Sequence, residues 1–168
     1  MLTIPATIAE AMIAHARELA PHECCGILGG THGDVSAHYR ITNILATLSE
    51  DELERFDAPK LSDLKQLSPE ERADIAFQMD SQEMGKALRD IREKELMLQA
   101  FYHSHTMSPA RPSQTDITIA MEFEGYREKL NLPEPLHIII SLLDAASPDI
   151  RAYRIHNGEA TEVPITRS

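Results

Sequence analysis

The sequence of 168 residues predicts one α+β domain whose mixed β-sheet is flanked by helices. Segments with apolar residues at helical spacing are interspersed with segments of alternating or continuously apolar character. No regular βα repeat connects them, and short turns join several of the predicted strands. The chain is long enough for one domain with a genuine core and short for two, so we expect a single unit over 1–168.

The first half of the chain predicts one helix and two strands. Residues 7–19 place apolar side chains at roughly helical spacing, and Pro21 ends this helix. A short apolar strand follows at 24–30 and ends in a glycine turn. Residues 35–44 alternate well enough to form the next strand.

The second half begins with a helix that starts at an Asp80 or Ser81 cap. Several apolar and polar patterns then follow in quick succession. They predict a strand at 96–105, a helix at 113–130, a buried strand at 137–144 and a hairpin at 150–165 that turns at Asn157 and Gly158.

A polar segment at about 47–76 separates the two halves. Nine acidic and four basic residues lie between Glu50 and Asp74, and "SPEERADI" carries a local helix signal. We therefore expect an acidic helical insertion outside the core. Loops of this length in compact domains are usually functional or mobile. The alternative is a solvated helical excursion without a role, because a charge run is most often a wetted surface.

Charge and composition exclude several classes of function. The net charge is −11 and the basic residues form no run, which argues against a nucleic-acid partner. The first twenty residues lack a basic n-region, and "IIISLL" is far too short to span a bilayer. The two cysteines, Cys24 and Cys25, are adjacent, which makes a structural disulfide implausible. We expect a cytoplasmic protein without a membrane partner, and its oligomeric state stays open.

The stretch "FYHSHTMSPARPSQTD" at 101–116 carries the candidate chemistry. In an extended strand His103 and His105 project from the same face while Ser104 points away. Neutral imidazole is a common zinc ligand, and a catalytic zinc site needs a third protein ligand. Asp116 is a candidate if Ser113 caps the following helix. The alternative is a capping box without a metal, next to an exposed pair of histidines.

The whole constellation resembles the JAMM (MPN+) metalloprotease family in its small prokaryotic branch. His103-Ser-His105, seven residues, Ser113, two residues and Asp116 match the family signature H-[ST]-H-x7-S-x-x-D. The segment "PHECCGILGG" supplies Glu23 where the family has a glutamate before a C-G-hydrophobic pattern. The resemblance covers nearly the whole chain apart from the acidic insertion. It implies the MPN/JAMM fold, which is cytidine-deaminase-like.

The resemblance also implies a role for each of these residues. His103, His105 and Asp116 would bind Zn²⁺, and Glu23 would act as general base and later protonate the leaving amine. Ser113 would donate its hydroxyl to the oxyanion of the tetrahedral intermediate. The implied function is a zinc metallopeptidase that hydrolyses a peptide bond at the C-terminus of a ubiquitin-like sulfur-carrier protein.

Two other functions are compatible with the resemblance. One is an isopeptidase that removes ubiquitin-like modifiers from lysine, and the other is a non-catalytic MPN scaffold, whose members usually lack one or more metal ligands. In eukaryotic deubiquitinating relatives an insertion ahead of the histidine pair helps to hold the substrate, which suggests the same role for 47–76.

Two local features require comment. Thr106 stands where many relatives of the family have proline, so we expect a looser loop after His105. A thiol nucleophile at Cys24 or Cys25 is a further alternative. However, the pair opens an apolar strand, where buried cysteine behaves as a small hydrophobe.

Overall fold

The computed structural model describes residues 1–49, 51, 67–127 and 129–168. Within this part, one sheet of eight strands forms the centre of the molecule, in the order β7-β6-β5-β4-β2-β3-β1-β8. The strands are β1 Leu2–Ile4, β2 Cys25–Thr31, β3 Asp34–Ile41, β4 Met97–His105, β5 Leu136–Ser141, β6 Asp149–His156, β7 Glu159–Val163 and β8 Ile165–Arg167. β1 runs parallel to β3 and β8, β4 runs parallel to β5, and the other pairs are antiparallel. The predicted α+β class with a mixed sheet is confirmed.

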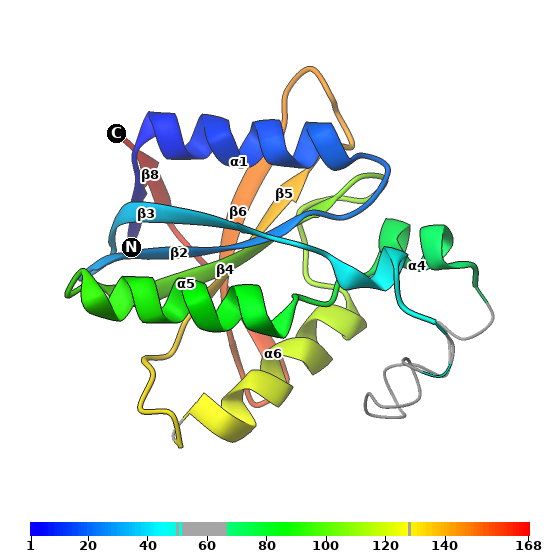
Figure 1. The fold of residues 1–168 in the computed structure, drawn as a ribbon. Helices are drawn as coiled ribbons and strands as arrows, with labels where there is room; N and C mark the ends of the chain where they lie inside the picture. Colours follow the sequence, from blue (N-terminus) through cyan, green and yellow to red (C-terminus); the bar gives the residue numbers. More distant parts are fainter. Residues whose placement is uncertain (50, 52–66, 128) are drawn as a thin grey trace.

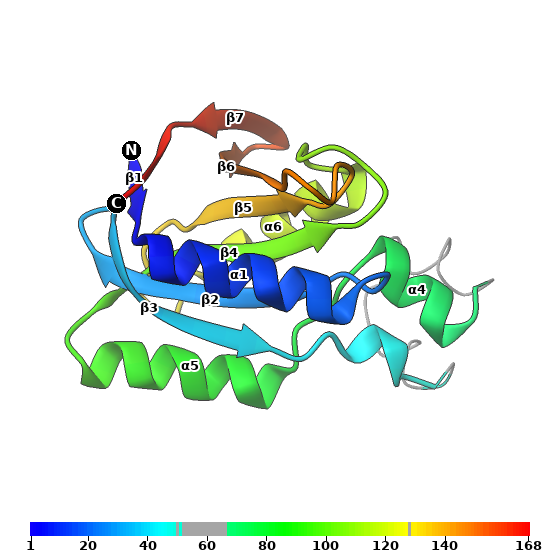
Figure 2. The same cartoon turned by 90° about the horizontal axis from the view of Figure 1, so that it is seen from above.

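Helices cover both faces of this sheet (Figures 1 and 2). α1 lies on one face, and α5 and α6 lie on the other. The described helices are α1 Ala6–Leu19, α4 Pro69–Ile75, α5 Ser81–Glu93 and α6 Gln114–Arg127, with a 3₁₀ turn η1 at Ile44–Ala46. The predicted cap of α5 is present, because the Asp80 side chain accepts a hydrogen bond from the Glu83 N–H. Asn157 and Gly158 form the predicted hairpin turn with positive φ angles of 52° and 78°.

Neighbouring residues on the central strands contribute to different cores. Cys24 and Tyr102 pack with α1, whereas Cys25 and Phe101 pack with α5 and with Phe123 of α6. This division follows from the alternation of side chains along a strand. It also decides the location of the candidate site, because His103 and His105 share the parity of Phe101 and therefore face α6.

The two ends of the chain meet in the sheet, which the sequence did not predict. β1 pairs with β8 through Leu2 and Ile165, and the Ala6 N–H donates to the Ser168 carbonyl at 2.8 Å. The hairpin predicted at 150–165 is present as β6 and β7, but the prediction did not include β8, which pairs with β1. Pro164 separates β7 from β8, so the two edge strands of the sheet are consecutive in the chain. The sheet consequently curls around α1 (Figure 2).

The predicted acidic insertion lies only partly within the described residues. Its last part forms α4, which begins with a capping box between Ser68 and Glu71 and buries Arg72 and Ala73. Residues 52–66, on which the rest of this prediction falls, lie outside the described part of the chain.

None of the helices formed by residues 1–49, 51, 67–127 and 129–168 combines the length and the apolar character needed to cross a membrane.

Gly26 allows β2 to lie against a fully buried tyrosine. A Cβ on Gly26 would overlap the Tyr102 ring, whose hydroxyl bonds to His15 Nδ1 and His38 Nε2, both at 2.7 Å. We expect Gly26→Ala to lower the free energy of unfolding by about 1–3 kcal/mol through overpacking. Urea denaturation measures this loss.

Gly85 on α5 provides the matched control for that substitution. A Cβ on Gly85 meets no atom within 4 Å, so Gly85→Ala should stabilise the protein by about 0.5–1 kcal/mol through helix propensity. Equal stability of the two variants would contradict the packing role of Gly26.

Candidate metal centre

The two histidines of β4 lie side by side on the sheet face that carries α6. Their Nε2 atoms are 3.1 Å apart, and both side chains are 5% exposed. Ser104 points to the opposite face as predicted, and its Oγ accepts the Cys24 N–H at 2.8 Å. Ser104 therefore fastens the start of β2 to the strand that carries both imidazoles.

Asp116 reaches the histidines from the first turn of α6. The Ser113 N–H donates to Asp116 Oδ2 at 2.8 Å, and the Asp116 N–H donates to Ser113 Oγ at 3.1 Å. At the same time Asp116 Oδ1 lies 3.1 Å from His103 Nε2, and Oδ2 lies 3.1 Å from His105 Nε2. The capping box and the convergence on the histidines thus coexist in one side chain.

The loop between β4 and α6 is anchored at three successive carbonyls. Ser108 O accepts from Ser141 Oγ at 2.6 Å, Pro109 O accepts from His105 Nδ1 at 2.9 Å, and Ala110 O accepts from Tyr153 Oη at 2.5 Å. Because a carbonyl only accepts, His105 Nδ1 carries the proton. His105 Nε2 faces Asp116, so the protonated ring donates there, whereas the neutral ring would offer a lone pair to a metal ion.

Glu23 completes the cluster from the segment that leads into β2. Its N–H donates to the Ala73 carbonyl at 2.7 Å, and its carbonyl accepts from Asn43 Nδ2 at 2.9 Å. Glu23 is 4% exposed, and its Oε1 atom is buried without a hydrogen-bond partner among the residues that the structure describes. Burial raises the pKa of Glu23 well above its usual value, and the nearby charges of Asp116 and Asp74 raise it further.

The pKa values of Asp116 and His105 are shifted in opposite directions. Burial alone would raise the pKa of Asp116, but the His103 charge and hydrogen bonds from both imidazoles and from Ser113 hold it well below its usual range. For His105, in contrast, burial alone would lower the pKa, because it disfavours the charged imidazolium. Its hydrogen bonds to Asp116 and to Pro109 outweigh burial and raise the pKa.

The donor set fits a zinc ion. One ligand atom from each of Glu23, His103, His105 and Asp116 lies within 4.8 Å of the other three. Ligand atoms about 2.0–2.2 Å from one ion are about 3.3 Å apart at tetrahedral angles, close to the observed separations of 3.1 Å. Two imidazoles and a carboxylate are borderline ligands that suit Zn²⁺, and the orphaned Glu23 oxygen suits a water on the remaining position.

A family model described as prokaryotic homologs of the JAB domain matches residues 5–156. The chain belongs to this family. Membership confirms the resemblance to the JAMM/MPN family that the motif indicated. CysO-cysteine peptidases of Mycobacterium bovis and Mycobacterium tuberculosis are 29% identical over 167 residues, which span 98% of this chain and 90% of theirs.

Two solved structures resemble the fold of this chain. A protein from Desulfitobacterium hafniense aligns with a TM-score of 0.70 and 28% identity, over 100% of this chain and 93% of its own. A JAB1/MPN domain protein from Archaeoglobus fulgidus aligns with a TM-score of 0.50 over 99% of both chains. At 14% identity, the second likeness shows a shared fold.

The remaining candidate residues of this JAB domain have other surroundings. Cys24 and Cys25 are fully buried, and burial raises the pKa of Cys24 to about 12, so a thiolate nucleophile is disfavoured. His15 and His38 bond to Tyr102 on the opposite sheet face. Thr106, where a looser loop is expected, donates from Oγ1 to the Pro21 carbonyl at 3.1 Å.

Sequence reasoning missed Asn43, which ties Glu23 to the chain beyond α4. Nδ2 donates to the carbonyls of Glu23 and Ala76, and Oδ1 accepts from the N–H groups of Leu45 and Gln78. The amide thus uses its full bonding capacity in a buried position. No sequence signal singles out this asparagine, because its four partners come together only in the folded chain.

We expect Asn43→Ala to lower the free energy of unfolding by about 2–3 kcal/mol, because it leaves buried backbone groups without partners. Urea denaturation measures this loss. Gln82→Ala, which removes an exposed amide on α5, is the control and should change stability by less than about 0.5 kcal/mol. Similar losses in the two variants would show that Asn43 does not anchor the segment.

Proposed function

We propose that the protein is a zinc-dependent metallopeptidase of the JAMM type, which hydrolyses a peptide bond at the C-terminus of a ubiquitin-like sulfur-carrier protein. The observation that carries this proposal is the buried convergence of Glu23 with His103, His105 and Asp116. The name of the mycobacterial relatives supports the substrate class. We further propose that residues 1–168 form one domain, because the first and last strands complete the same sheet.

In this proposal His103, His105 and Asp116 hold the zinc ion. Bound zinc would lower the pKa of a water molecule from near 16 toward about 7. Glu23 then serves as general base at Oε1, the buried oxygen that has no hydrogen-bond partner within the described part of the chain. A carboxyl whose pKa is raised by burial holds the proton well enough to deliver it to the leaving amine.

Ser113 has two roles in this proposal. Its Oγ accepts the Asp116 N–H and thereby caps α6, which holds Asp116 against the imidazoles. A hydroxyl that accepts one hydrogen bond still has its own proton to donate. We assign that proton to the oxyanion of the tetrahedral intermediate.

We also propose where the protein acts and on what kind of substrate. Both cysteines are free and buried, which agrees with a reducing compartment, and we propose that the enzyme acts in the cytoplasm on a protein substrate.

Burying the carboxylates of Glu23 and Asp116 beside each other is costly, and a non-catalytic scaffold would gain nothing from this cost. Lysine-linked and tail-extended carriers, supplied as alternative substrates, distinguish an isopeptidase from a C-terminal peptidase.

Glu23→Gln should lower the rate of cleavage by about 10²- to 10⁴-fold, because the amide cannot accept the proton. Mass spectrometry of ubiquitin-like carriers extended beyond Gly-Gly, incubated with zinc-loaded protein, measures the rate. Removing zinc with a chelator should abolish cleavage, and added zinc should restore it. Glu10→Gln on the exposed face of α1 is the matched control. Full activity of Glu23→Gln would refute the mechanism.

Ser113→Gly should lower kcat by about 10²- to 10³-fold, since the oxyanion loses one donor. Glycine is also accepted at the N-cap of a helix, so the free energy of unfolding should fall by only about 0.3 kcal/mol. Steady-state kinetics and urea denaturation separate the two effects. Ser113→Thr keeps both the hydroxyl and the cap, and it should retain most activity. A Ser113→Gly enzyme with unchanged kcat would restrict Ser113 to the capping role.

A further inference from the structure

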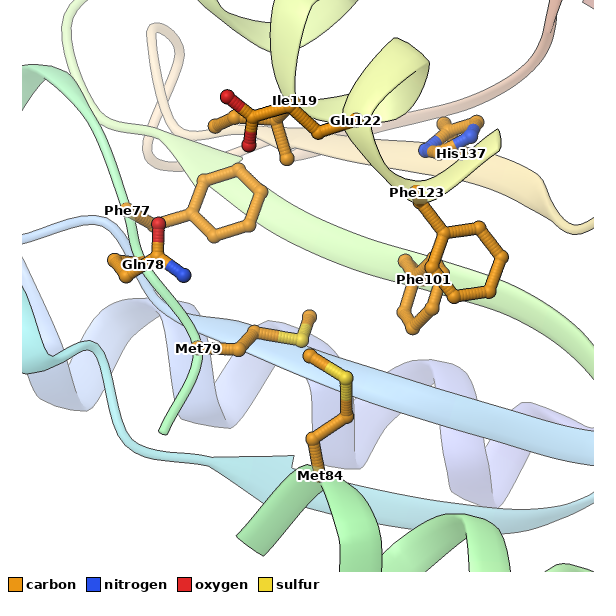
Figure 3. Close-up of a pocket in the computed structure, with 9 residues that line it drawn as sticks. All are labelled: Phe77, Gln78, Met79, Met84, Phe101, Ile119, Glu122, Phe123 and His137. Atoms are coloured by element: carbon orange, nitrogen blue, oxygen red, sulfur yellow. The ribbon is translucent and has the colours of Figure 1, made fainter. Parts of the chain in front are cut away.

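A small apolar pocket lies beside the metal-ligand cluster, between α5, α6 and the sheet (Figure 3). Three aromatic rings, two thioethers and one branched aliphatic side chain make its apolar wall. They belong to Phe77, Phe101, Phe123, Met79, Met84 and Ile119. In Figure 3 the thioether ends of Met79 and Met84 approach each other below the Phe77 ring. None of these residues has a part in the chemistry described above.

The pocket and the cluster share the same strand face and the same helix. Phe101 precedes His103 by two residues on β4, which places it about 6.6–6.8 Å away along the strand. Ile119 follows Asp116 by three residues on α6, so the two lie on neighbouring turns of one helix face. The pocket is therefore within reach of a side chain whose main chain passes over the cluster.

Phe77 forms the wall between the pocket and the cluster. Its ring stacks on His103 with centroids 4.6 Å apart and an interplanar angle of 25°. Phe77 also belongs to the segment that Asn43 ties to Glu23 through the Gln78 N–H. A group in the pocket would thus contact the same ring that packs against a proposed zinc ligand.

The size of the pocket indicates one side chain. Its volume is about 70 Å³. A leucine or methionine side chain has about that size, whereas a cavity that holds benzene is about 150 Å³.

The lining also indicates the polarity of the occupant. Burial lowers the pKa of His137 to about 4, and the His103 charge adds to this effect, so the ring is uncharged at neutral pH. The lining residues include Glu122 but no lysine or arginine, so an acidic occupant would find no positive charge among them. Methionine walls adapt to different apolar shapes and make favourable contacts with sulfur and aromatic groups.

We propose that this pocket is a specificity subsite, which accepts an apolar side chain of about leucine size from a residue flanking the scissile bond. The proposal rests on the peptidase function proposed above. An apolar side chain on the residue before the scissile bond and one on the residue after it would both fit the pocket. The experiment below distinguishes these two positions.

Zinc-loaded protein is tested on carrier-tail peptides in which one flanking residue at a time is alanine, leucine, methionine, phenylalanine or aspartate. At one of the two positions, leucine or methionine should exceed alanine in kcat/KM by about tenfold or more. Phenylalanine and aspartate should be poor at that position, because of size and charge respectively. The position that shows selection identifies the residue that enters the pocket.

Three variants connect this selection to the pocket. Met84→Phe fills the pocket and should bring the leucine-to-alanine ratio of kcat/KM close to one. Ile119→Ala enlarges it and should raise kcat/KM for the phenylalanine peptide relative to leucine. Met121→Ala is the matched control, because Met121 lies on α6 but is 50% exposed and does not line the pocket. Its ratios should equal those of the parent protein.

Binding of the same peptides to Glu23→Gln, measured by calorimetry, separates the subsite from the peptidase function. Cleavage without selection at either position, or selection that Met84→Phe and Ile119→Ala leave unchanged, would overturn the subsite and leave the peptidase. Absence of cleavage together with leucine-selective binding would overturn the peptidase and support the subsite. Absence of both would overturn both proposals.

Discussion

The site depends on the electrostatics of two carboxylates and two imidazoles that are buried within 4.8 Å of one another. Burial raises the pKa of Glu23 and the nearby charge of Asp116 raises it further, whereas the imidazoles help Asp116 to keep its charge. A divalent cation at this place would compensate the negative charge and use the lone pairs that converge there. The surrounding structure can be understood as the means of holding these four groups close together.

Two local devices and one set of long-range hydrogen bonds bring the groups together. The two-residue period of β4 aligns the imidazoles, and the capping box of α6 aims Asp116 at them. Glu23 has no such local device, so long-range hydrogen bonds place it. Ser104 fixes the residue after Glu23, and Asn43 and Ala73 bind its main chain. The general base is consequently the group whose position depends most on tertiary contacts.

The expected elements with strong local signals agree with the structure. α1 has helical periodicity, α5 begins at a side-chain cap, and the turn at Asn157 and Gly158 contains a glycine. Each of these signals lies within a short window of sequence. β1 and β8 have only three residues each and were missed. Three residues carry too little periodicity to indicate a strand, and the pairing of Leu2 with Ile165 joins opposite ends of the chain.

The sequence by itself determined the donor types, their spacing and the family, because alternation along a strand and capping at a helix start are local properties of the chain. Tertiary structure alone decided that Glu23 lies beside Asp116, that Asn43 anchors it, and that Phe77 separates His103 from an apolar pocket. These contacts join segments that are distant in sequence, so they depend on how the sheet and helices pack and not on any local pattern.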